Sequence, residues 1–355
     1  MELTARRDLG CRTGNSMPRA RSSGRWAVRE GPTFSVVIPA FNAADTVGEA
    51  FASLLQQSEE SWEAIAVDDG STDETYAVCR RFVAEDPRFH VVRHEDGLNH
   101  GPSGARNLAL RHATGALVAF LDADDAYLPI ALATFREAFR AWPSVDVVYG
   151  RAETFGGGVP TLMCLGIPGT PYGVFDQLAR FNVLLTCTAA VRRSALLPAP
   201  FPESMRLAED WACWLQLARH SGFLFLEQVV ARRRLRPGSA MGRLVTGDCG
   251  AVIAAAQGRH LRSLLDSAGP EERAGIRRGL AYRASEALRE AASRIRRRAL
   301  RGALVWLEAA LVISGSPRTL LEAIAQIRPE QRRIRRGEDP PLTLSPPPAP
   351  ATAKR

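Results

Sequence analysis

The sequence lacks the patterns that mark several common classes of protein. It contains only six cysteines among 355 residues, and none of them forms a C-x-x-C pair. This scatter argues against a disulfide scaffold or a zinc ribbon. No uncharged apolar run approaches the roughly 20 residues that cross a bilayer, and the N-terminus carries charge without the apolar segment of a secretory signal. We therefore expect a protein of the reducing cytoplasm.

Motifs of several enzyme classes are missing as well. No G-x-x-x-x-G-K-[ST] segment is present, which excludes a P-loop. The six histidines show neither H-x-x-x-H nor H-E-x-x-H spacing, so packing and surface roles are favoured over metal binding for them. Apolar residues nevertheless make up 46% of the chain, which is enough to bury a sizeable core.

The net charge of +8 is unevenly distributed along the chain. Residues 31–231 hold fourteen basic and twenty-four acidic residues, a net charge of −10, whereas residues 232–327 hold eighteen arginines and eight acids, a net charge of +10. An arginine-rich segment can bind nucleic acid electrostatically. This one contains no recognised reading motif, so we expect no nucleic-acid partner.

Composition divides the chain into four parts. Residues 1–32 are polar and rich in Arg, Gly and Ser, and we predict a disordered basic leader. Residues 337–355 form a proline-rich tail that we expect to be extended and disordered. Periodic hydrophobic patterns fill the two parts between them, an α/β domain over 33–242 and a helical basic appendage over 243–336.

Short apolar runs alternate with amphipathic stretches in the α/β part. The predicted strands are 34–39, 62–67, 89–93, 117–121, a strand beginning at 146, and 223–231. The predicted helices are 45–57, one that opens at 71–74, 103–113, one that follows Pro129, and 211–220. This alternation predicts a mainly parallel sheet with helices on both faces. In such sheets, ligands bind beyond the carboxyl ends of the strands.

Two groups of carboxylates lie at predicted strand ends. Asp68 and Asp69 end one strand, and the segment Asp122-Ala123-Asp124-Asp125 follows another. Carboxylates so close together repel one another, and a bound cation is the simplest compensation. Oxygen ligands suit Mg²⁺ or Mn²⁺, which commonly also bind substrate phosphates. Each segment alone would be read as a polar turn that caps a helix, but the second group at the same sheet edge favours a metal site.

Four segments taken together resemble the family-2 glycosyltransferases with the GT-A fold. These are FSVVIPAFNAADTVGEAFASLLQQ, AIAVDDGSTDET, GPSGARNLALRHATGALVAFLDADD and AEDWACWLQLA, in the family's order and spacing. The resemblance covers about residues 33–240. It implies a metal-dependent, inverting transferase that takes a sugar from a nucleotide-diphosphate donor, commonly UDP-linked.

The resemblance also implies roles for the residues that bind the donor nucleotide. Phe41 would line the nucleobase pocket, and Pro39 and Ala123 are further candidates for binding the nucleotide sugar. Asp69 would bind the base, commonly uracil, with Asp68 beside it. Arg106 and Asn107 occupy positions near the nucleotide.

Metal binding and catalysis are assigned by the same resemblance. Asp122 and Asp124, separated by Ala123, match the DxD motif that holds the cation on the diphosphate and ribose. Asp125 is a further candidate ligand, since the register decides which two of the three carboxylates touch the metal. Asp210 matches the catalytic base, although Glu209-Asp210 alone would be read as a first-turn acidic pair favoured by the helix dipole.

Arg236 and Ser239 resemble a pair in a loop that closes over the diphosphate. Arginine binds phosphate oxygens well. A solvated basic surface explains the neighbouring arginines equally well, and both interpretations stay open.

The basic appendage is predicted to be helical over 244–267, 271–292, 293–313 and 318–327. The third helix combines a broad apolar stripe with arginines crowded at its start, which is typical of a helix lying on an anionic membrane surface. Packing against the catalytic domain or a partner, with the arginines in water, is the alternative that we favour slightly.

The resemblance implies an enzyme that glycosylates a glycan or lipid-linked acceptor, either in the cytoplasm or as a peripheral protein at the inner face of the plasma membrane. Synthesis of surface polysaccharide or glycolipid is the expected setting. A nucleotidyltransferase would carry a Gly-rich basic loop after the first strand, which Pro39-Ala40-Phe41-Asn42 is not. A non-catalytic, transferase-like scaffold that binds membrane or a partner through its basic helices is the remaining alternative.

Overall fold

A computed structural model describes residues 32–156, 161–164, 166, 173–198, 200–235, 249–297 and 299–325, which all lie in one compact unit of the chain. The predicted tail, and the predicted leader apart from Pro32, lie outside these residues. So do the expected boundary at residue 242 and the candidate pair Arg236 and Ser239.

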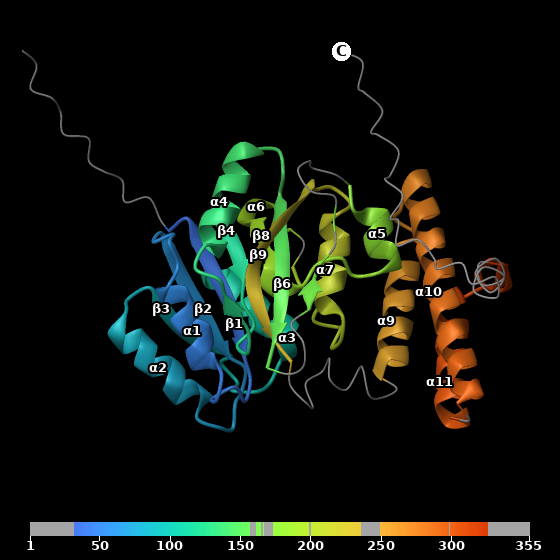
Figure 1. The fold of residues 1–355 in the computed structure, drawn as a ribbon, viewed down its shortest axis with the longest axis horizontal. Helices are drawn as coiled ribbons and strands as arrows, with labels where there is room; N and C mark the ends of the chain where they lie inside the picture. The colour runs from blue at the N-terminus through green and yellow to red at the C-terminus, as the bar shows by residue number, and fades with distance from the viewer. Residues whose placement is uncertain are drawn as a thin grey trace, which may run out of the picture. The chain divides into compact units, whose positions relative to one another are not determined.

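A mixed sheet of nine strands forms the centre of the described part (Figure 1). Its order is β3-β2-β1-β4-β8-β6-β9-β5, and β7 pairs with β6. The strands are β1 (Phe34–Ala40), β2 (Trp62–Asp68), β3 (Phe89–Arg93), β4 (Leu117–Phe120), β5 (Ala126–Tyr127), β6 (Val147–Phe155), β7 (Leu162–Met163), β8 (Ala189–Arg192) and β9 (Phe223–Arg234).

Most strands of this sheet run in one direction. The pairs β3-β2, β2-β1 and β1-β4 are parallel. Strand β8 runs antiparallel to both β4 and β6, so β6 and its parallel neighbour β9 keep the direction of β4. The mainly parallel sheet is therefore confirmed. Strands β5, β7 and β8, which oppose this direction, were not predicted.

The helices are α1 (Val47–Leu55), α2 (Thr75–Glu85), α3 (Gly101–His112), α4 (Ala131–Ala141), α5 (Phe175–Arg180), α6 (Arg193–Leu196), α7 (Glu209–Leu217), α9 (Cys249–Ser263), α10 (Pro270–Arg296) and α11 (Leu300–Ser314), with a 3₁₀ turn η1 (Thr186–Thr188). Residues 317–325 are also helical. The helical C-terminal region is therefore confirmed.

Side chains along each strand alternate between the two faces of the sheet, so each face has its own hydrophobic cluster. In β1, Val36 and Ile38 pack in one hydrophobic cluster with residues of α1, α2 and α4. Val37, which points the other way, packs with residues of α3, α5 and α7. Full burial of each such side chain contributes about 1.5–3 kcal/mol. Both faces are thus covered by helices, as the sequence predicts.

The C-terminal helices share the second of these clusters. Leu261 of α9, Ile276 of α10 and Ile313 of α11 are completely buried in it. The Arg283 side chain of α10 donates hydrogen bonds to the carbonyls of Ala179 (2.7 Å) and Leu178 (3.1 Å) at α5. In the described residues, therefore, α9 and α10 pack on the catalytic part, and α9 also forms a small separate hydrophobic cluster with α11 through Ala251, Ala255 and Ala309.

One predicted helix boundary is wrong. Residues 293–296 end α10, and α11 begins only at Leu300. Ala299 has φ −90° and ψ 64°, which breaks the helix so that α11 folds back along α10. Neither Gly nor Pro marks this turn in the sequence.

Among the described helices, none is by itself long and apolar enough to cross a membrane. Only the bent pair Arg301–Ser314 and Pro317–Ala325, with 116° between its halves, meets the length and composition criteria when taken together.

Candidate active site

A cleft of about 560 Å³ opens at the carboxyl ends of β1, β2 and β4. It gathers residues from all of the motifs that precede α4 in the sequence. Seven predicted site residues line it: Pro39, Phe41, Asp69, Arg106, Asp122, Ala123 and Asp124. The N-terminus of α3 supplies Gly101 and Pro102. The cleft lies where parallel-sheet topology places ligand sites.

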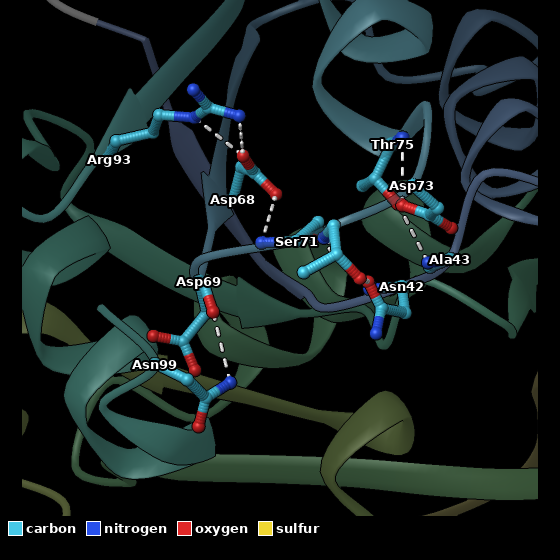
Figure 2. Close-up of polar contacts among 10 residues, drawn as sticks. Asn42, Ala43, Asp68, Asp69, Ser71, Asp73, Thr75, Arg93 and Asn99 are labelled. Atoms are coloured by element: carbon cyan, nitrogen blue, oxygen red, sulfur yellow. Dashed lines mark hydrogen bonds and ion pairs between the residues drawn. The ribbon is translucent and has the colours of Figure 1, made fainter. Parts of the chain in front are cut away.

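The loop after β1 is held against the loop after β2. Asn42 adopts φ +47°, a left-handed conformation that few non-glycine residues take. Its side-chain oxygen accepts a hydrogen bond from the Thr72 backbone (2.9 Å), and its own N–H donates to Ser71 Oγ (3.0 Å) (Figure 2). Phe41, half exposed beside this fixed turn, presents an aromatic ring to the cleft.

The adjacent aspartates of β2 have different surroundings (Figure 2). Asp68 is completely buried, and its carboxylate accepts a hydrogen bond from Arg93 Nε at 2.6 Å. It is not part of the described cleft lining. Asp69 lines the cleft, and its two carboxylate oxygens accept the backbone N–H groups of His100 and Gly101, both at 2.8 Å. Burial raises the pKa of Asp69, although these hydrogen bonds oppose the rise.

A close backbone contact explains why a glycine, Gly70, follows the aspartate pair. Its φ is +75°, and a Cβ there would lie 2.9 Å from the backbone nitrogen of Asn99. Any larger residue would separate the β2 loop from the segment that leads into α3. The side chain of Asn99 donates a hydrogen bond to the Asp69 carbonyl across the same contact (2.9 Å).

Arg106 connects two of the acidic motifs. Its side chain is buried and donates to Asp122 Oδ1 at 2.9 Å and to Glu209 Oε1 at 2.8 Å. Burial alone would lower the pKa of Arg106, but the surrounding carboxylates outweigh it and raise the pKa. Burial raises the pKa of Glu209, with Arg106 opposing the rise. The DxD segment and the first turn of α7 are thereby joined through one guanidinium.

The other two carboxylates of the DxD segment lie differently. Asp124 lines the cleft, and its backbone carbonyl accepts a hydrogen bond from Arg234 Nε (3.1 Å). Asp125 is buried outside the described cleft lining, where Oδ1 accepts the Arg234 N–H (2.9 Å). Burial, and then the charges of Asp122 and Asp124, raise the pKa of Asp125 to about 7.

Asp210 lies in the first turn of α7, next to Glu209. Its Oδ2 is 3.3 Å from Thr186 Oγ1 and 3.4 Å from Asn182 Nδ2. Ala208 just before it has φ +59°, which is strained for alanine. Such strain is typical of a functional turn. Asp210 is not among the described residues that line the cleft.

Protein groups already compensate most of the carboxylates at the two strand ends. Arg93 compensates Asp68, Arg106 compensates Asp122, and backbone N–H groups compensate Asp69. Repulsion between the two strand ends therefore does not by itself require a metal. Among the described residues, no group of three Asp, Glu, His or Cys side chains is arranged to hold one.

The sequence did not predict some of the residues that line the cleft, and one residue predicted near the nucleotide, Asn107, is not in the described lining. Arg206, which is exposed in the loop before α7, lines the cleft but was not predicted. It lies two residues before the segment AEDWACWLQLA begins, and no pattern in the sequence singled it out. Asn107 faces away from the cleft and binds the 201–203 loop, where its Nδ2 lies 2.9 Å from the Phe201 carbonyl.

Comparison with known proteins shows the family to which the chain belongs. The family model described as glycosyl transferase family 2 matches residues 35–197. The teichuronic acid biosynthesis glycosyltransferase TuaG of Bacillus subtilis, whose function is inferred, is 31% identical over 188 residues, 53% of this chain and 73% of TuaG. The chain belongs to glycosyltransferase family 2.

Two further relatives of this family-2 transferase are similar over comparable lengths. The succinoglycan biosynthesis protein ExoU of Rhizobium meliloti is 43% identical over 190 residues, 50% of this chain and 54% of ExoU. UDP-Glc:alpha-D-GlcNAc-diphosphoundecaprenol beta-1,3-glucosyltransferase WfgD of Escherichia coli is 28% identical over 186 residues, 52% of this chain and 69% of WfgD.

Solved structures support the fold. TarS 1–349 of S. aureus has a TM-score of 0.55 at 20% identity, with 86% of this chain and 92% of that chain covered. The mannosyltransferase PcManGT of Pyrobaculum calidifontis, solved with GDP-Man and Mn²⁺, has a TM-score of 0.54 at 21% identity, with 87% and 83% covered. The GT-A fold expected from the sequence is confirmed.

Proposed function

We propose that the protein transfers a sugar from a UDP-linked donor to a hydroxyl of a glycan or lipid-linked acceptor, with inversion. The observation that carries this proposal is the cleft itself, which joins the Phe41 and Asp69 loops to the DxD carboxylates. The names of TuaG and ExoU support a role in cell-surface polysaccharide synthesis, and that of WfgD supports a UDP-sugar donor.

In this proposal, the nucleobase lies against the exposed ring of Phe41 and beside Pro39 and Asp69. An aromatic ring provides a stacking surface for any base. Asp69 is anchored by backbone N–H groups, so it is held rigidly at the cleft wall. Asp68 acts indirectly, because its bond with Arg93 fixes the end of β2.

Asp122 and Asp124 are the proposed metal ligands. Both line the cleft, and their hard oxygens fit Mg²⁺ or Mn²⁺, which proteins commonly bind with one or two carboxylates plus substrate phosphates. The PcManGT structure with Mn²⁺ supports this choice. A cation bound there would neutralise charge that grows on the leaving diphosphate. Asp125, buried and bonded to Arg234, acts as a support for the loop.

Asp210 is the proposed base. Its carboxylate would accept the proton of the acceptor hydroxyl while that oxygen bonds to the anomeric carbon. The bond from that carbon to the diphosphate oxygen breaks in the same displacement, so the nucleoside diphosphate leaves and the configuration inverts. Glu209, held by Arg106, and the strained Ala208 fix the direction of the turn that carries Asp210.

We also propose that α11 contacts the inner face of the plasma membrane. Leu304, Leu307 and Leu311, spaced along one face of α11, are exposed. Leu321 and Ile324 of the following helical residues are exposed as well, and Arg296 and Arg297 are exposed just before α11. Apolar side chains beside arginines favour an anionic membrane surface.

Calorimetric titration with UDP, GDP, CMP and dTDP, with Mn²⁺ or with a chelator, tests the donor proposal. We expect UDP to bind in a metal-dependent way. The Asp124→Ala variant should bind UDP at least about tenfold more weakly, whereas Glu137→Ala, on the exposed side of α4, should bind it normally. Absence of binding by every nucleotide would favour the non-catalytic scaffold instead.

A further inference from the structure

A second cavity of about 460 Å³ lies between the loop that precedes α7 and one side of α9. It shares Arg206 with the donor cleft, so this side chain forms part of both walls. Arg259 and His260 of α9 line the opposite side. We call this cavity the α9 groove.

The lining of the α9 groove combines cations with apolar surface. Two arginines and a histidine contribute to it, and no carboxylate occurs among the described residues that line it. Met205, Leu207 and Val252 add apolar surface, and Val252 is 52% exposed. A single ligand that satisfies both halves would carry an anionic group beside an apolar chain.

His260 provides an unused polar group at this site. Its Nε2 atom is buried and has no hydrogen-bond partner among the described residues. Buried polar atoms are nearly always paired in folded proteins, so an unpaired one in a residue that lines a cavity is a candidate to bind a ligand or a water there. A phosphate oxygen could pair with this nitrogen in its N–H form.

The α9 groove also lies close to the proposed base. The imidazole of His260 packs edge to face on Trp211, with ring centroids 5.8 Å apart. Trp211 directly follows Asp210 in the first turns of α7. A molecule in the groove would therefore lie against the helix whose His260 contacts the residue that follows Asp210, whereas the proposed donor nucleotide would enter from the strand ends.

We propose that the α9 groove binds the phosphate of an acceptor that carries a phosphate or diphosphate ester on an apolar chain. Arg259 and His260 bind the phosphate oxygens, and Val252 and Leu207 contact the apolar chain. This inference rests on the proposed function, since the bound ester is the molecule that would be glycosylated. It also gives α9, outside the family-model match, a direct role in the site.

Titration of the full chain with farnesyl diphosphate tests this, with UDP and Mn²⁺ present at saturation to keep the probe out of the donor cleft. We expect farnesyl diphosphate to bind. Arg259→Gln should weaken that binding by roughly tenfold or more, since a charge-assisted contact is lost. Arg277→Gln, an exposed arginine on α10, should leave it unchanged. UDP affinity, measured in separate titrations of the same three proteins with Mn²⁺ and without farnesyl diphosphate, should be equal.

Two further arms separate the parts of the proposal. Val252→Ser should weaken binding of farnesyl diphosphate but not of pyrophosphate, and equal affinity of the wild type for the two probes would overturn the apolar half. The groove assignment is wrong if UDP binds normally and farnesyl diphosphate does not bind. It is also wrong if farnesyl diphosphate binds Arg259→Gln as tightly as it binds the wild type. If UDP fails to bind while the probe still requires Arg259, the groove stands and the donor proposal fails.

Discussion

Arg106 is the residue at which the acidic segments of the site meet. Its guanidinium is buried between Asp122 and Glu209 and lies over the Phe201 ring at 5.2 Å. A buried charge with two partners costs much more to disrupt than an exposed ion pair. The site therefore depends on this side chain for its shape as well as for its charge.

Replacement of Arg106 by Met should lower the free energy of unfolding by about 3–5 kcal/mol at neutral pH, because it leaves the buried Glu209 and the partly exposed Asp122 without their shared cation. Burial already raises the pKa of Glu209, and the variant loses the cation that opposes this rise. The folded variant then takes up a proton more readily than the unfolded chain, so the loss should shrink as the pH falls toward about 5.

Urea unfolding at about pH 7.5 and about pH 5 measures this difference. Arg140→Gln is the control, since Arg140 pairs with Glu137 on the surface and its side chain is 72% exposed. We expect it to change stability by less than about 1 kcal/mol at either pH. A loss for Arg106→Met that does not vary with pH would contradict the expected rise in the pKa of Glu209.

Phe41 offers a test of the nucleobase position. Because its side chain is half exposed, Phe41→Ala should leave the melting temperature nearly unchanged. Loss of base stacking should weaken UDP binding by roughly tenfold. Leu98→Ala, at an exposed position outside the cleft lining, is the control for nonspecific effects. Unaltered UDP affinity of Phe41→Ala would place the base elsewhere.

Among the secondary-structure elements, the sequence predicted those strands and helices that a local hydrophobic pattern marks. Strands β1 to β4 were predicted within one residue at each end. Strands β1, β2 and β4 are nearly continuous buried runs, whereas only the first residue of β3 is buried. Strands β5 and β7, with two residues each, exist only through pairing with β9 and β6, and no local pattern announces that pairing.

Adjacent carboxylates show what the sequence pattern alone cannot predict about the site. Consecutive residues of a strand point to opposite sides, so of the pair at the end of β2 only Asp69 reaches the described cleft lining. The pair of aspartates by itself does not show which member faces the ligand, and the choice of Asp69 came from the family resemblance. Arg93 and Arg206 come from segments without a predicted role, and only the fold brings them to these aspartates and to the cleft.

The exposed face of α11 supports a prediction at the same scale. Leu304→Gln, Leu307→Gln and Leu311→Gln together should lower co-sedimentation with vesicles that contain phosphatidylglycerol by at least about fivefold, since each buried leucine contributes about 1.5–3 kcal/mol. Neutral phosphatidylcholine vesicles test whether binding needs the negative charge of the lipid, and we expect weaker binding to them. Leu55→Gln, at an exposed position on α1, tests whether the loss is specific to α11, and we expect it to bind like the wild type. Equal binding by the wild type and the triple variant would exclude this face as the membrane contact.

At the scale of the whole molecule, the helical region and the sheet share one core. Gly279 of α10 lies against α5, where a Cβ would be 2.6 Å from the Ala179 carbonyl oxygen. Gly279→Ala should therefore destabilise the entire protein by about 1–3 kcal/mol. Gly48→Ala in α1, where a Cβ would meet only ordinary contacts at 3.9 Å, should instead stabilise it slightly.

Differential scanning calorimetry checks this expectation. We expect one unfolding transition whose midpoint falls in Gly279→Ala, because the disturbed contact belongs to the same cooperative unit as the sheet. Two transitions, with only the smaller one shifted, would show that α9 to α11 unfold independently. Such independence would also weaken the proposed role of α9 beside the active site.

The most direct test of the whole account is release of UDP from UDP-sugars in the presence of a lipid-linked acceptor extract and Mn²⁺. It compares the wild type with Asp124→Ala and Asp210→Asn. The account predicts acceptor-dependent release that falls by at least about a hundredfold in Asp210→Asn, although this variant still binds UDP normally. Release that persists in Asp210→Asn, or wild-type protein that binds UDP but never releases it from any UDP-sugar, would contradict the proposed transferase mechanism.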